Sequence, residues 1–265
     1  MYQYPHHRDS VQKLLDYFAD TPGVLAVVLG GSVAKGLARP DSDVDALVIL
    51  TEPAYEARRA EGRLSECISG YCTYPEGYFD IKYLTKAFLS AVSDHGSEPA
   101  RNAFRSAVCL RSSDPEIPVL VSRIAVYPKA LKADKMLSFY SALSLNTGYF
   151  WDMSRHDNLF LKVRTASEIV LWGFRLLLAD REVLFPCQKA LAATVRALPD
   201  KPEGIAEKAD QFLSRMDDES KEAFVSAVLG GIRYTPPEDY SEVLTRYIDD
   251  FEQWWLNGRP NVIEW

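Results

Sequence analysis

The sequence predicts an α/β (α+β) protein with two domains: a mixed sheet with covering helices over residues 1–125, and a bundle of helices over residues 126–265. The first domain is indicated by two short apolar runs, at 24–29 and 44–51, which are typical of strands buried on both faces. The second is indicated by the loss of such runs beyond Tyr127, where long segments with helical periodicity take over. With 265 residues and 47% hydrophobic content, the chain can fill both cores.

Helices and further strands surround the two apolar runs in the first domain. Apolar residues at helical spacing from Val11 to Phe18 predict a first helix, with Asp9 or Ser10 as its N-cap. The other elements expected in this domain are a charged surface helix over 53–68, a strand over 77–85, helices over 86–92 and 100–107, and a short strand over 108–111.

Six helices are expected in the second domain, and proline or glycine separates several of them. Their ranges are about 130–150, 158–179, 187–198, 204–216, 221–229 and 240–256. In the second of these helices, Leu159, Phe160, Leu161 and Val163 suggest packing on nearly all sides.

Charge and cysteine content restrict the classes of function and partner. The chain has 30 basic and 37 acidic residues, a net charge of −7, and no lysine- or arginine-rich block of the kind that follows a phosphate backbone. A nucleic-acid acceptor is therefore disfavoured, and a neutral or cationic small molecule fits better.

The four cysteines form no C-x-x-C pair, and no stretch reaches the roughly 18 apolar residues of a membrane span, so we expect a cytoplasmic protein without membrane association. Trp254 and Trp255 either pack the last helix or form a contact in a homodimer.

A glycine turn ends the first expected strand, with the sequence Gly30-Gly31-Ser32. Glycines at this position let backbone N–H groups approach a phosphate closely, and a serine adds a hydroxyl donor. These three residues are therefore candidates for nucleotide binding, although such a turn taken alone is common.

Three aspartates follow on the next strands. Asp43 and Asp45 alternate along the start of a strand, so both side chains point to one face, about 7 Å apart between Cα atoms. Asp80 is an acid inside an otherwise apolar strand, and it is costly to bury without a partner. Two carboxylates placed in this way repel each other unless a divalent cation lies between them, which predicts a magnesium site.

This pattern of G-S, ten residues and D-x-D, with a later strand aspartate, resembles the signature of polymerase β-type nucleotidyltransferases over about residues 24–85. In length and layout the chain resembles the small bacterial members that inactivate aminoglycoside and lincosamide antibiotics. The resemblance implies that Gly31 and Ser32 hold the β- and γ-phosphates of ATP or another nucleoside triphosphate. It also implies that the D-x-D pair ligates two Mg²⁺ ions and that Asp80 completes the catalytic site.

Four further polar residues are candidates for nucleotide binding. Lys35 flanks the glycine turn, and Lys82 shares a strand face with Asp80, where it contacts phosphate or forms an ion pair with an aspartate. Asn158 and Lys162 lie on one polar stripe of a long helix. That stripe either contacts the nucleotide or acceptor, or is an ordinary solvated face.

The resemblance implies transfer of a nucleoside monophosphate, with AMP from ATP as the first expectation, to a hydroxyl of a small molecule, with release of pyrophosphate. Asp80 is the first candidate for the general base, although a separate carboxylate is also compatible with the sequence. The alternatives are nucleotidylation of a protein or RNA, as in toxin-type relatives, and a non-catalytic nucleotide-binding partner protein. Three convergent acids favour an enzyme over a simple binding protein.

Overall fold

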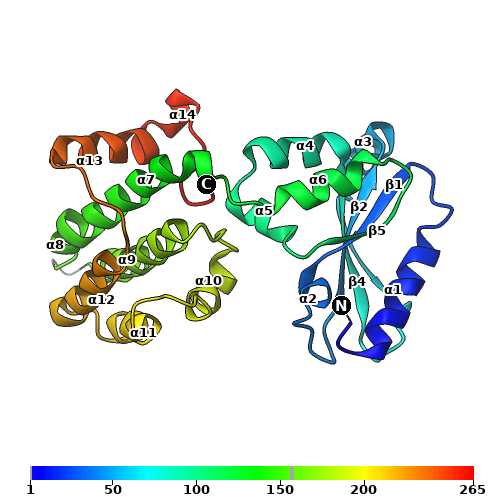
Figure 1. Ribbon diagram of the computed structural model, residues 1–265, viewed down its shortest axis with the longest axis horizontal. Coiled ribbons are helices and arrows are strands. Elements are labelled where there is room, and N and C mark those ends of the chain that lie inside the picture. The colour runs from blue at the N-terminus through cyan, green and yellow to red at the C-terminus, as the bar shows by residue number, and fades with distance from the viewer. Residues whose placement is uncertain (1, 156–157) are drawn as a thin grey trace. The chain divides into compact units, whose positions relative to one another are not determined.

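The computed structural model describes residues 2–155 and 158–265, and the chain forms two compact units, Met1–Val126 and Tyr127–Trp265 (Figure 1). The first unit contains a five-stranded mixed sheet with helices, and the second is helical, with no strand among its described residues. This is the α/β fold with a helical C-terminal region that the sequence predicts. None of the described helices combines the length and the apolar composition needed to cross a membrane.

The sheet of the first unit has the strand order β3-β4-β2-β1-β5. Its strands are β1 (Val24–Leu29), β2 (Val44–Leu50), β3 (Ser65–Ser69), β4 (Tyr78–Thr85) and β5 (Val108–Ser112). β2 and β4 run parallel, and the other neighbouring pairs are antiparallel. The two apolar runs of the sequence therefore become the central strands β1 and β2, where burial on both faces is expected.

Each face of the sheet carries an apolar layer, with α1 on one side and α4 and α6 on the other (Figure 1). These helices span Pro5–Tyr17, Lys86–His95 and Glu116–Ile124 respectively. Val11 and Leu14 of α1 belong to the same buried cluster as Phe79 of β4. Leu89 of α4 and Ile117 of α6 belong to a second cluster, which includes alternate residues of β1 and β2. The period-2 alternation of the strands thus decides which side chains face which helix.

The surface helix predicted over 53–68 is wrong in its second half. Helix α3 (Glu52–Ala60) ends early, Gly62 adopts a left-handed φ of +70°, and the edge strand β3 follows. Exposed and half-buried residues alternate along β3, as expected for an edge strand with one partner. Its low apolar content hid it from sequence analysis.

The first helix begins earlier than its predicted cap. It starts at Pro5, a residue whose fixed φ suits a first helical turn, rather than after Asp9 or Ser10. Ser10 is buried, and its hydroxyl accepts a hydrogen bond from the Thr73 N–H at 3.0 Å. Ser10 therefore fixes a distant loop to the helix instead of capping it.

The end of the first unit also differs from expectation. Helix α5 (Glu98–Ala103) is shorter than the predicted 100–107, and α6 was not predicted. Pro118 lies in the first turn of α6, where a missing N–H does no harm.

The second unit is built around a long central helix, α9 (Leu159–Asp180). The other elements are η1 (Lys129–Leu131), α7 (Lys132–Leu145), η2 (Asn146–Phe150), α8 (Trp151–Met153), α10 (Gln188–Arg196), α11 (Ile205–Arg215), α12 (Asp218–Gly230), α13 (Tyr240–Tyr247), η3 (Ile248–Glu252) and α14 (Trp254–Asn257). Trp172 of α9 is fully buried, with its ring 5.8 Å from that of Phe139 and 5.7 Å from that of Phe251. The middle and end of α9 therefore form the core of the unit.

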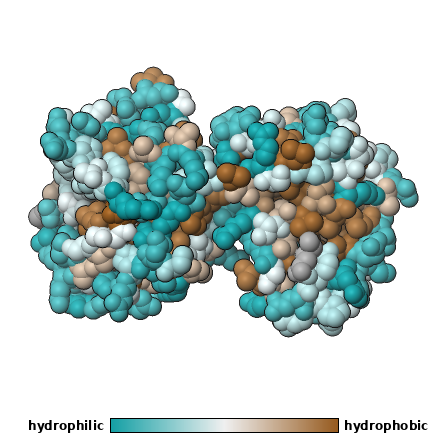
Figure 2. Space-filling model, viewed as in Figure 1, coloured by the Kyte–Doolittle hydropathy of each residue, from teal (hydrophilic) through white to brown (hydrophobic). Residues whose placement is uncertain are grey.

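The start of α9 is not packed all round, contrary to the prediction. Leu159, Phe160 and Val163 are 71%, 75% and 45% exposed. The apolar side chains of the first turns therefore reach the surface. Figure 2 shows apolar residues in brown on the visible face of both units. The hydrophobic residues at the start of α9 therefore did not indicate burial of that part of the helix.

Candidate active site

Three carboxylates converge at one end of the sheet in the first unit. Asp45 on β2 and Asp80 on β4 are direct partners in the parallel register, and Asp43 lies two residues before Asp45. Oxygen atoms of all three lie within 4.8 Å of one another, and each side chain is half-buried. The predicted convergence of Asp43, Asp45 and Asp80 on one face is confirmed.

The alternation of the two strands determines which face carries the acids. Val44 and Phe79, the residues just before Asp45 and Asp80, point into the core beneath α1. The acids consequently lie on the other face, at the starts of β2 and β4. Further along the same face Leu47 packs beneath α4 and α6, so those helices cover the later part of the strands.

The glycine turn lies directly against this cluster. It leads into α2 (Gly31–Ala34), and the Gly30 N–H donates a hydrogen bond to the Asp45 carbonyl oxygen at 3.0 Å. Gly31 has a φ of +61°, and a Cβ at this position would lie 1.6 Å from the Asp45 Oδ2 atom. Only glycine can therefore occupy position 31 while Asp45 keeps its place.

Ser32 has a hydroxyl group without an internal partner. Its Oγ is out of contact with solvent and makes no hydrogen bond within the described chain. A buried hydroxyl without a hydrogen-bond partner costs about 1–3 kcal/mol of stability. An unpaired group of this kind therefore needs an explanation, such as binding a ligand or taking part in catalysis. A phosphate oxygen bound at the turn would supply the missing partner.

Burial and neighbouring charges both change the pKa of the central acid of this cluster. Burial is the largest cause of a rise in the pKa of Asp45 to about 6, the charges of Asp43 and Asp80 contribute to the same rise, and Lys82 and Lys35 oppose it. Lys35 is half-buried immediately after α2, and Lys82 is exposed on β4. The structure thus brings both predicted lysines within electrostatic reach of the acids.

Residues that sequence analysis missed hold the loop in front of Asp43. The Ser42 carbonyl accepts hydrogen bonds from the Tyr74 hydroxyl at 2.5 Å and from the His7 Nε2 at 3.1 Å. The Tyr78 hydroxyl bonds to Asp43, whose charge raises the pKa of that tyrosine. These contacts join α1, the loop before β4 and the loop before β2. No local sequence pattern signals them.

The two candidates on α9 belong to the second unit, where both have local roles. Asn158 is the N-cap of α9, because its Oδ1 accepts a hydrogen bond from the Leu161 N–H at 3.0 Å. The Lys162 ammonium lies 6.0 Å from the centre of the Trp151 ring. Their contact with a nucleotide remains a prediction.

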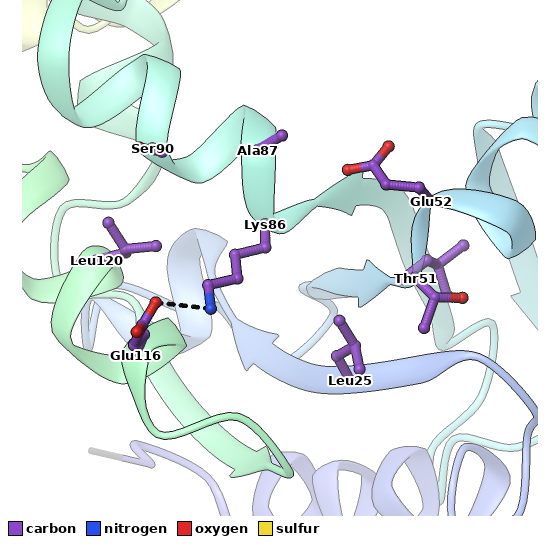
Figure 3. A pocket seen from close by; sticks show the side chains of 9 residues that line it. Leu25, Thr51, Glu52, Lys86, Ala87, Ser90, Glu116 and Leu120 are labelled. Carbon is purple, nitrogen blue, oxygen red and sulfur yellow. Dashed lines mark ion pairs between the residues drawn. The ribbon is translucent and has the colours of Figure 1, made fainter.

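A separate pocket of about 480 Å³ lies at the opposite ends of β2 and β4 (Figure 3). Lys86 points into it, but its Nζ is 2.7 Å from carboxylate oxygens of Asp114 and Glu116. Since two carboxylates already neutralise this lysine, the pocket is poorly suited to a triphosphate. The acid cluster beside the glycine turn is the stronger candidate.

Comparison with known proteins agrees with this choice. Residues 11–89, which contain the glycine turn and all three acids, match the family model of the nucleotidyltransferase domain. A search of curated proteins found no match. One similar solved structure is a nucleotidyltransferase-like protein from Exiguobacterium sibiricum 255-15, with 10% identity, a TM-score of 0.47, and coverage of 96% of this chain and 80% of that one. Another is spectinomycin adenyltransferase AAD(9) from Enterococcus faecialis, solved with ATP and spectinomycin, with 13% identity, a TM-score of 0.29, and coverage of 91% and 95%.

Proposed function

We propose that this protein, whose residues 11–89 match the nucleotidyltransferase domain, transfers AMP from ATP to a hydroxyl group of a small molecule. The observation that carries this proposal is the convergence of Asp43, Asp45 and Asp80 beside a turn that only glycine can form.

The residues present fit magnesium. Mg²⁺ prefers hard oxygen ligands, and the cluster offers three carboxylates whose mutual repulsion a cation would relieve. Two such ions, when bound, would stabilise the attacking and leaving oxygens of an in-line displacement at phosphorus. Asp43 and Asp45 would hold the ions, and Asp80 would complete the site as the first candidate to take the proton of the acceptor hydroxyl.

Other residues of the first unit would hold and orient the triphosphate. The Ser32 hydroxyl, which has no internal partner, would donate to a phosphate oxygen. Lys35 and Lys82, which already act on the charge of Asp45, would offset the charge of the departing pyrophosphate. Gly30 and Gly31 allow the backbone to approach the phosphates closely.

A small acceptor fits the charge of the chain better than a nucleic acid. The net charge is −7, and the sequence has no basic block. A hydroxyl-rich cation of the aminoglycoside type is the first acceptor to test, because an acidic protein attracts it. Nucleotidylation of RNA or protein, and nucleotide binding without catalysis, remain the alternatives.

The test is a screen for pyrophosphate release with the four ribonucleoside triphosphates, Mg²⁺ and a panel of acceptors that includes aminoglycosides, lincosamides, tRNA and a protein mixture. We expect turnover with ATP and a small hydroxyl compound, whose adduct is identified by mass spectrometry. The Asp45→Asn variant should be inactive. Asp41→Asn is its matched control, because Asp41 is an exposed loop acid paired with Arg39. Labelling of tRNA or protein, with no small acceptor modified, would contradict the proposal.

A further inference from the structure

A second pocket lies in the helical unit, between α9 and α10, and nucleotidyl transfer does not account for it. Its volume is about 340 Å³, within the range of pockets that hold small organic molecules. The walls are apolar, formed by Val170, Leu171 and Phe174 of α9 and by Leu191 and Ala192 of α10.

Glu168 brings a carboxylate to this apolar wall. Its Oε2 atom is out of contact with solvent and has no hydrogen-bond partner of ordinary geometry. Glu168 as a whole is half-buried and lines the pocket, so part of its side chain remains accessible there. Burial raises the pKa of Glu168, although the indole of Trp172 and the charge of Arg164 act in the opposite direction. The carboxylate is therefore under-solvated and gains from a cationic partner.

Two polar residues beside Glu168, Arg164 and Ser167, form neither an ion pair nor a hydrogen bond with its carboxylate. Arg164, one turn before Glu168 on α9, is exposed and forms no ion pair among the described residues. The Ser167 hydroxyl is occupied, since it donates to the Val163 carbonyl at 2.9 Å. An exposed guanidinium is well solvated and contributes little at the rim. The half-buried carboxylate therefore decides which charge the pocket prefers.

We propose that the pocket between α9 and α10 binds a small organic cation, with its ammonium group on Glu168 and its apolar part against Phe174 and Leu191. The acid supplies the charge selectivity, and the apolar walls bury the body of the ligand. The proposal concerns binding to the second unit alone and does not depend on the proposed transfer reaction. The cation is either the acceptor itself or a separate ligand, and the experiment distinguishes these sources.

The probe is 2-phenylethylammonium, titrated into the full-length protein by isothermal calorimetry at pH 8 and moderate salt. The matched probes are 2-phenylethanol, which lacks the charge, and phenylacetate, which reverses it. We expect the ammonium compound to bind and each of the other two to bind at least about tenfold more weakly, the size expected for one charged hydrogen bond.

Three variants locate the binding. Glu168→Gln should weaken the ammonium compound by about tenfold or more, and Ala192→Trp should abolish binding by filling the pocket. Glu207→Gln is the control, because Glu207 is an exposed acid elsewhere in the same unit, on α11. Circular dichroism checks that each variant is folded. Absence of ammonium binding, equal binding of phenylacetate, or unchanged affinity in Glu168→Gln would each overturn the proposal.

The transferase assay distinguishes whether the bound cation is the acceptor or a separate ligand. Competition between 2-phenylethylammonium and the acceptor would identify the pocket as the place of the acceptor, and non-competitive behaviour would identify a separate ligand. The Asp45→Asn variant should retain full affinity for the ammonium compound. Failure of the transfer reaction would therefore leave the binding result intact.

Discussion

Replacing Asp45 with asparagine should stabilise the metal-free protein while it disables the proposed active site. In the folded chain the pKa of Asp45 rises from 3.8 to about 6, mainly through burial and then through the charges of Asp43 and Asp80. A shift of about two pH units corresponds to about 3 kcal/mol, since one unit is about 1.4 kcal/mol. Asp45 is partly exposed, so solvent screening reduces the expected cost to about 1–2 kcal/mol.

The direction of the pKa shift determines how the stability difference between Asp45→Asn and the wild type changes with pH. Because the folded-state pKa lies above the unfolded value of 3.8, ionised Asp45 opposes folding. The penalty is fully present above about pH 6 and disappears as the pH falls below about 4. The difference in unfolding free energy between Asp45→Asn and the wild type should therefore be about 1–2 kcal/mol at pH 7.5 and shrink towards pH 4.5.

The measurement is urea unfolding in EDTA at several pH values, followed by the same series with Mg²⁺. Magnesium should stabilise the wild type at pH 7.5 but add little to Asp45→Asn, because the variant lacks a ligand. Asp41→Asn is the control, since Asp41 and Arg39 form an exposed pair, with side chains 74% and 79% exposed, and should change stability by less than about 0.5 kcal/mol. An Asp45→Asn protein no more stable than the wild type in EDTA would refute the reasoning.

Three further predictions concern the same site. Asp80→Asn should lower turnover by about 10³-fold or more with the unfolding midpoint little changed, as pyrophosphate release and urea unfolding would show; near-normal turnover would contradict its role. Gly31→Ala should unfold at clearly lower urea than Gly36→Ala, because both positions have positive φ but only a Cβ at Gly31 meets Asp45; equal losses would show that backbone strain alone matters. Tyr74→Phe removes a hydrogen bond that holds the loop before the acids, so it should cost about 1 kcal/mol of stability. It should also weaken Mn²⁺ binding, measured by electron paramagnetic resonance. Unchanged Mn²⁺ affinity would limit that tyrosine to a structural role.

The acid cluster could be predicted from the sequence because its geometry is local. Alternation along a strand places Asp43 and Asp45 on one face, and the isolated acid in the apolar run Phe79-Asp80-Ile81 points to a neighbouring strand. What the sequence could not give was the register that makes Asp45 and Asp80 direct partners. Register depends on the pairing of whole strands, which no single motif specifies.

The supporting contacts were hidden because they join segments far apart in the chain. His7 and Tyr74 both bond to the Ser42 carbonyl, from 35 and 32 residues away. β3 and α6 were missed for a different reason, since the polar residues of β3 were assigned to the surface helix predicted over 53–68 and no element was predicted over α6. Apolar periodicity identifies a strand or a helix only where that element has a buried face, because only a buried face selects apolar residues.

A contrast within the protein strengthens the assignment of the acids to a ligand site. In the second unit, Asp250 is only 2% exposed, and its two oxygens lie 2.9 Å from the Arg246 Nε and 2.8 Å from the Arg259 Nε. The chain thus pairs a buried carboxylate with arginine where the role is structural. Asp45 has no such partner among the described residues, and two other carboxylates lie beside it. The chain neutralises one buried acid with two arginines but leaves three half-buried acids facing one another, and this difference supports the proposed cation site.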